Sequence, residues 1–135
     1  GMDEEITPGQ LQELKDKFVA GQFADRTPMF VEQPFEVSID GIVIRGRMDA
    51  VFRDESGWHI VDWKTGQLPS RADMRYLMMQ LAVYRIAWAQ LQGIDPDEIH
   101  ASFYYVRYDK LSSADNLPSE REIAETLRLA AQPIE

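Results

Sequence analysis

The sequence contains no cysteine among its 135 residues, and this absence excludes several kinds of site at once. Disulfides, cysteine-held zinc, catalytic thiols and iron–sulfur clusters bound by four cysteines are all ruled out. No apolar run approaches the roughly 18 residues of a membrane-spanning helix, and the chain does not begin with a signal-peptide pattern. The glycine-rich loop that binds nucleotide phosphates is also missing. We therefore expect a cytoplasmic protein with no membrane partner, whose only cofactors are hard metal ions.

Positive charge is scarce as well. The chain has 14 lysines and arginines against 23 aspartates and glutamates, which gives a net charge of −9. Affinity for a nucleic-acid backbone comes mainly from basic side chains that displace counterions, so the net charge argues against a large, non-specific DNA-binding surface. Any nucleic-acid binding by the isolated chain should be weak. The basic residues that could contribute gather around the motifs described below: Arg45, Arg47, Arg53, Lys64, Arg71, Arg75 and Arg85.

The hydrophobic content of 44% is enough for one core, so residues 1–135 are expected to form a single domain. Hydrophobic periodicity and turn residues define its elements. Helices are predicted at residues 8–20, 72–92 and 120–131, the last capped by Ser119. Strands are predicted at residues 29–39, 42–53, 58–64 and 101–107.

The connections between these elements predict the topology of the sheet. Asp40-Gly41 is a turn signal between the first two strands, and a turn centred on Gly57 makes the second and third strands an antiparallel hairpin. The chain then passes through the long helix to the fourth strand, and such a crossover joins parallel strands in a right-handed sense. The expected fold class is α/β, with a mixed sheet of four or more strands flanked by helices.

Charged side chains interrupt the apolar strands of this hairpin. Side chains alternate along a strand, so Asp62 and Lys64 point to the same face, roughly 6.5 to 7 Å apart. Asp49 lies in the neighbouring strand, where pairing could bring all three together. Charged groups are rarely buried unless they are paired or bind a metal. The pattern fits either a simple Asp62–Lys64 ion pair or a catalytic metal site, and the additional carboxylate of Asp49 favours the metal site.

Four motifs follow one another along the chain: VEQPF at 31–35, GRMDAV at 46–51, VDWKTG at 61–66 and QLAVY at 80–84. In this order and spacing they resemble the PD-(D/E)xK nuclease superfamily. Within it, they resemble the RecB-like nuclease domains found at the C-terminal ends of UvrD-type helicases and in AddB. The resemblance covers about half of the chain. It implies a restriction-endonuclease-like core.

The resemblance also implies a role for each motif residue. Asp49 and Asp62 would ligate Mg²⁺ or Mn²⁺, the backbone carbonyl of Trp63 would add a ligand, and Lys64 would act on the attacking water. Carboxylates suit a hard divalent ion, which lowers the pKa of bound water and neutralises charge on the phosphoryl oxygens. The lysine charge would stabilise the transition state. Glu32 would bind or orient the metal, or else is a solvent-facing strand residue.

Gln80 and Tyr84 lie four residues apart in the long predicted helix, so they share one face. They resemble the family's Q-x-x-x-Y element, which implies that they contact the lysine, the metal site or the DNA. From the residues alone, Tyr84 is better explained as part of the apolar face of the helix, together with Leu77, Leu81, Trp88 and Leu91.

The chain departs from the RecB-like pattern in one respect. These domains carry a metal-binding histidine on a helix before the first strand, whereas the two histidines of this chain are His59 and His100. Both are better explained as structural or surface residues. Gly1-Met2 is typical of the remnant of a cleaved tag, so we expect the missing helix to lie upstream, within a larger helicase–nuclease polypeptide. A variant domain without the histidine is the alternative.

The expected function is that of a metal-dependent deoxyribonuclease domain, which hydrolyses phosphodiester bonds in DNA repair or recombination. The resemblance implies that its DNA is single-stranded and is unwound by a helicase motor in the same or a partner chain. An incomplete metal site would leave this chain inactive alone. The alternative is a module that has kept the nuclease fold and serves DNA binding or scaffolding in a repair complex. A purely structural α/β domain is the third possibility.

Overall fold

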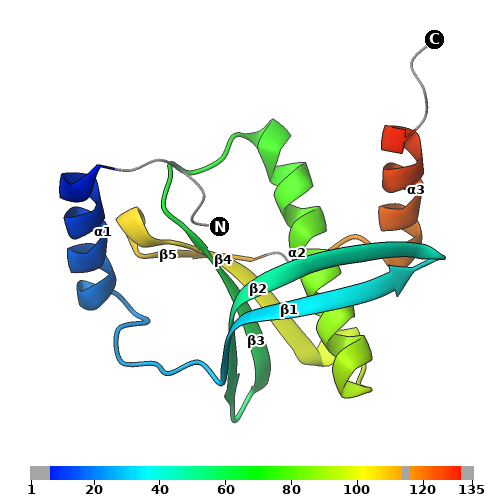
Figure 1. Ribbon diagram of the computed structural model, residues 1–135, viewed down its shortest axis with the longest axis horizontal. Coiled ribbons are helices and arrows are strands. Elements are labelled where there is room, and N and C mark those ends of the chain that lie inside the picture. Colours follow the sequence, from blue (N-terminus) through cyan, green and yellow to red (C-terminus); the bar gives the residue numbers. More distant parts are fainter. Residues whose placement is uncertain (1–6, 114–115, 132–135) are drawn as a thin grey trace.

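The computed structural model describes residues 7–113 and 116–131 (Figure 1). The predicted elements are all present, with bounds within two residues of those expected. The helices are α1 (Pro8–Ala20), α2 (Arg71–Gln92) and α3 (Glu120–Ala131). The strands are β1 (Phe30–Ile39), β2 (Ile42–Asp54), β3 (Gly57–Lys64) and β4 (Ile99–Tyr105). Three short elements were not predicted: the 3₁₀ turns η1 (Pro96–Glu98) and η2 (Val106–Tyr108), and strand β5 (Lys110–Ser112).

The strands of the described residues form one sheet in the order β1-β2-β3-β4-β5. β3 and β4 are parallel, whereas the other neighbours are antiparallel. The expected crossover through α2 and the expected hairpin between β2 and β3 are therefore confirmed. The mixed sheet with its flanking helices confirms the α/β fold class.

Local sequence explains where the elements begin and end. Thr7 and Gln10 form a reciprocal capping box at the start of α1, and Ser70 caps α2 by accepting a hydrogen bond from the backbone N–H of Asp73. α2 ends at Gly93, whose left-handed conformation (φ 67°) favours glycine. The β1–β2 turn likewise has positive φ at Asp40 and Gly41, as expected of a tight hairpin.

Both faces of the sheet are covered by apolar side chains. On one face, Ile60 and Phe103 pack with residues of α2 such as Trp88. On the other face, Val61 packs with a smaller cluster that includes Leu14 of α1. Figure 1 shows α1 on one side of the sheet and α2 on the other. The alternation predicted for β3 is confirmed, since Ile60 and Val61 belong to different clusters.

His59 lies on the α1 side of β3, where its Nε2 is 2.9 Å from the Ser102 hydroxyl. Burial, together with the positive charges of Arg26 and His100, lowers the pKa of His59 from 6.5 to about 4. As the pH falls, His59 therefore takes up a proton in the unfolded chain at a higher pH than in the folded chain. We expect the free energy of unfolding to have its full value above pH 6.5 and to decline as the pH falls from 6.5 to 4. Urea unfolding should show this decline, and a His59→Gln variant that kept the full decline would contradict the assignment.

Within the described ranges, no helix combines the length and apolar character needed to cross a membrane.

Candidate active site

Asp49 and Asp62 lie opposite each other, one position past the last paired residues of the β2–β3 ladder, Ala50 and Val61. The Asp49 carboxylate accepts a hydrogen bond of 2.9 Å from the backbone N–H of Trp63. Asp62 is only 2% exposed. The hairpin thus ends in two neighbouring carboxylates, one from each strand, as its sequence predicted.

Lys64 completes this group. Its Nζ lies 3.0 Å from Asp62 Oδ2, and its side chain is 22% exposed. The ammonium group also lies over the Phe103 ring, 4.9 Å from its centroid, in a cation–π contact. The ion pair that was the simpler of the two sequence predictions is present, and Asp49 stands beside it. Asp49, Asp62 and Lys64 are therefore brought together.

The two carboxylates differ in proton affinity. Burial, the negative charge of Asp62 and a hydrogen bond with Asp62 raise the pKa of Asp49. Burial opposes ionisation of Asp62 too, but the charge of Lys64 and hydrogen bonds from Lys64 and Asp49 are among the contacts that hold the pKa of Asp62 below its usual value. Two adjacent carboxylates whose second ionisation is unfavourable are a donor set that suits a divalent cation.

Gln80 and Tyr84 reach the same group from α2. The Tyr84 hydroxyl donates a hydrogen bond of 3.4 Å to Asp62 Oδ1, and Gln80 Nε2 donates one of 2.6 Å to the Tyr84 oxygen. The Tyr84 ring is buried against Phe35. Both sequence predictions for Tyr84 therefore describe the same side chain, whose ring is part of the core while its hydroxyl contacts the carboxylate. Burial and the charge of Asp62 raise its pKa, so the hydroxyl stays protonated.

Glu32 occupies the corresponding position of β1. Its neighbours Val31 and Gln33 pair with Ala50 and Met48, so Glu32 stands level with Asp49. Its side chain is exposed, and its backbone is left-handed, with φ 48°. This conformation is costly for a residue other than glycine. The metal-orienting role of Glu32 stays a prediction.

The remaining predicted ligand and the two histidines lie differently. The Trp63 ring packs on the α1 face against Phe18 and Phe23, so only its backbone faces the carboxylates. His59 lies on that face too, and His100 is exposed. α1 precedes β1 but contains no histidine. No group of three or more histidine, cysteine or acidic side chains suited to a metal is found among the described residues.

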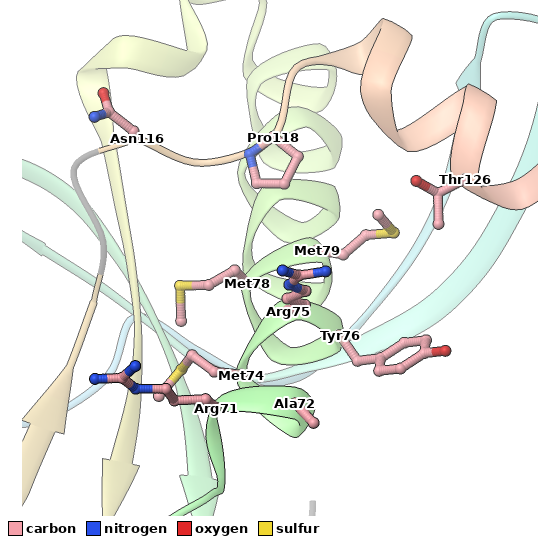
Figure 2. Close-up of a pocket in the computed structure, with 10 residues that line it drawn as sticks. All are labelled: Arg71, Ala72, Met74, Arg75, Tyr76, Met78, Met79, Asn116, Pro118 and Thr126. Atoms are coloured by element: carbon pink, nitrogen blue, oxygen red, sulfur yellow. The ribbon is translucent and has the colours of Figure 1, made fainter.

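One hollow lies away from these side chains, between α2 and the segment that contains Asn116, Pro118 and Thr126 (Figure 2). It has a volume of about 970 Å³ and is bordered by three methionines and by Arg71 and Arg75. Asp49, Asp62 and Lys64 do not border the groove, so it is not the catalytic centre.

Sequence reasoning missed three residues that support the site. The Phe103 ring makes a cation–π contact with the Lys64 ammonium group. Thr65 is 4% exposed, and its carbonyl accepts a hydrogen bond of 2.7 Å from Arg107. Tyr105 is paired with Lys64 across the parallel ladder. The parallel register of β3 and β4 sets Phe103 and Tyr105 beside Asp62 and Lys64, and this register could not be read from the sequence of the predicted fourth strand.

Comparison with known proteins finds the following similarities. The Gene 69 protein of Mycobacterium phage D29 is 37% identical over 71 residues, which is 53% of this chain and 24% of that protein. The crystal structure of SSO0001 aligns with a TM-score of 0.46 at 20% identity, over 93% of this chain and 62% of that chain. The chain spans less than two thirds of the length of each. Residues 4–134 match the family model of the PD-(D/E)XK nuclease superfamily. Since this match covers nearly the whole chain and the mixed α/β fold is restriction-endonuclease-like, the chain belongs to the PD-(D/E)XK nuclease superfamily.

Proposed function

We propose that this nuclease-family chain hydrolyses phosphodiester bonds of DNA with Mg²⁺ or Mn²⁺ held by Asp49 and Asp62. The observation that carries the proposal is the meeting of these two carboxylates with Lys64, whose Nζ is 3.0 Å from Asp62. A structural ion pair would need only one carboxylate. A second one beside it raises the cost of burying negative charge, and a divalent cation removes that cost.

Each residue has a distinct part in the proposed reaction. A bound divalent ion would supply Lewis-acid activation of water and neutralise charge on the phosphate. Lys64 orients the attacking water and places positive charge where negative charge develops. Tyr84 holds Asp62 by a hydrogen bond, and Gln80 in turn holds the Tyr84 oxygen. The carbonyl of Trp63 and the carboxylate of Glu32 are proposed as further metal contacts.

Metal dependence tests this function. Labelled single-stranded DNA, duplex DNA and single-stranded RNA should be incubated with Mg²⁺, with Mn²⁺ and with EDTA, and we expect cleavage of DNA only when a metal is present. Because an ion that binds only the folded chain stabilises it, the free energy of unfolding should also rise, by about 2.7 kcal/mol at roughly 100 times the Kd. A divalent ion that changed neither cleavage nor unfolding would contradict the proposal.

The biological setting is proposed from the sequence motifs and the net charge of the chain. The RecB-like motifs support single-stranded DNA as substrate, and a role in repair or recombination with a helicase in the same or a partner chain. The net charge of −9 agrees with DNA being delivered by another protein rather than captured by this chain. Cleavage should therefore rise when a partner helicase and ATP are added to duplex substrate. The same cleavage with and without the motor would contradict helicase coupling but not the nuclease.

One observation favours a second candidate function. The RecB-like pattern would require a histidine beside the carboxylates, and none of the described residues supplies one. The chain could then serve DNA binding or scaffolding in a repair complex. This alternative predicts that labelled DNA is bound but not cut, and that the amount bound is the same in EDTA.

A further inference from the structure

A second hollow, of about 510 Å³, opens directly beside Lys64. It lies between residues 66–70, which lead from β3 into α2, and Tyr105 at the end of β4, and Tyr76 of α2 also lines it. The volume falls within the range of pockets that hold small ligands. Because Lys64 belongs both to this hollow and to the carboxylate group, the hollow adjoins the proposed reaction centre.

Tyr105 brings a buried hydrogen-bonding group to this hollow. It is 2% exposed, and its hydroxyl has no hydrogen-bond partner in the described part of the chain. Tyr105 pairs with Lys64 in the parallel ladder, so the two side chains share a face of the sheet. Burial and the negative charge of Asp62 raise the pKa of Tyr105, so the hydroxyl remains a donor. A buried polar group without a partner is costly, and few proteins keep one without a use for it.

The start of α2 forms the opposite side of the hollow. Ser70 accepts a hydrogen bond from the backbone N–H of Asp73, and its carbonyl accepts one from that of Met74. Arg71 and Ala72, at the first two helical positions, border the hollow of about 970 Å³ and not this one. Ser70 and Asp73 do line it, so the hollow lies near the positive end of a 22-residue helix. Asp73 borders the hollow too, but its carboxylate accepts a hydrogen bond from the Ser70 hydroxyl and so belongs to the helix cap.

The segment between β3 and α2 is held in place from the end of β4. Arg107 donates its hydrogen bond to the carbonyl of Thr65, and Tyr108 bonds the side chain of Gln67. These contacts fix the wall of the hollow before any ligand arrives, which lowers the entropy cost of binding.

We propose that this hollow binds the phosphate of the nucleotide next to the bond that is cut, with the Tyr105 hydroxyl as donor and the Lys64 ammonium group beside it. The inference rests on the proposed nuclease function and adds a substrate-binding residue to it. A donor that lacks a partner, the nearby N-terminal end of a helix and the adjacent ammonium group all favour an anion. A DNA strand that crosses Asp62 and Lys64 would bring such an anion with it.

Tyr105→Phe tests the proposal, and Tyr104→Phe is its matched control. Tyr104 lies on the other face of the sheet, where its hydroxyl donates a hydrogen bond of 2.5 Å to Asp109. Tyr105→Phe should leave the unfolding midpoint unchanged or raise it, while kcat/KM for single-stranded DNA falls by about 10- to 100-fold, as for a lost hydrogen bond to a charged group. Tyr104→Phe should show the opposite: a lower unfolding midpoint and unchanged cleavage.

A modified substrate distinguishes direct phosphate contact from an indirect effect. Replacing the phosphate next to the scissile bond by a neutral methylphosphonate should slow the wild type by about tenfold or more, yet slow Tyr105→Phe no further. Cleavage by Tyr105→Phe at the wild-type rate would overturn the inference. So would a rate for the variant on the methylphosphonate that equals the product of the two separate reductions. If no cleavage depends on Asp62, the nuclease proposal fails. Weaker binding of a labelled oligonucleotide by Tyr105→Phe would still support the hollow, whereas equal binding would overturn it.

Discussion

Replacement of Asp62 by asparagine is expected to reduce the rate of DNA cleavage by roughly a thousandfold. The change removes the negative charge that Asp62 would present to the proposed metal ion, whose contribution to lowering the barrier is several kcal/mol. Each factor of ten in rate corresponds to about 1.4 kcal/mol. The change should leave the fold intact, because Lys64 is partly exposed and can remain charged. Single-turnover cleavage of labelled single-stranded DNA in Mg²⁺ and in Mn²⁺ measures the effect.

Asp54→Asn provides the control for this experiment. Asp54 lies at the far end of the same hairpin and is exposed, with Ser56 and Arg26 as its partners. Its replacement removes the same charge from the chain without touching the proposed site, so the cleavage rate should be that of the wild type. If Asp62→Asn instead unfolded the chain, the ion pair with Lys64 would be a structural necessity. If both variants cut at the wild-type rate, Asp62 would have no part in the reaction.

The proposed site could be found from the sequence because its main residues lie in short, regular stretches. The turn at Gly57 fixes the hairpin, and strand alternation then sets Asp62 and Lys64 on one face beside Asp49. The spacing of Gln80 and Tyr84 places them on one face of a helix, but only the crossover shows that this face meets Asp62. These steps use local geometry, which sequence periodicity records.

Contacts that depend on register or on irregular backbone could not be found in this way. Tyr105 was one of several tyrosines in a strand, and its position beside Lys64 follows from the parallel register of β3 and β4. The left-handed backbone at Glu32 has no signal in the residue itself. Phe23 lies between α1 and β1 in a stretch without periodicity, yet it is only 1% exposed. In each case the tertiary structure decides the environment, and neighbouring residues in the sequence do not reveal it.

Phe23→Ala is expected to lower the free energy of unfolding by about 3–5 kcal/mol, as for other buried aromatic truncations. The Phe23 ring contacts those of Phe52, Trp63 and Tyr104, with centroids 5.4, 5.4 and 4.7 Å away, respectively. Nothing else fills this position, so truncation should leave a cavity. Urea unfolding measures the effect, and an unchanged m-value would show that the comparison is between similar folded and unfolded states.

Phe30→Ala is the matched control, because this phenylalanine is 38% exposed and should cost less when truncated. Equal losses in the two variants would mean that Phe23 is not the centre of the α1-side core. The position of Phe23 also bears on the site, since its ring supports that of Trp63, whose backbone N–H holds the Asp49 carboxylate. At temperatures where Phe23→Ala remains folded, we therefore expect weaker metal binding than in Phe30→Ala, because Asp49 would be less firmly oriented.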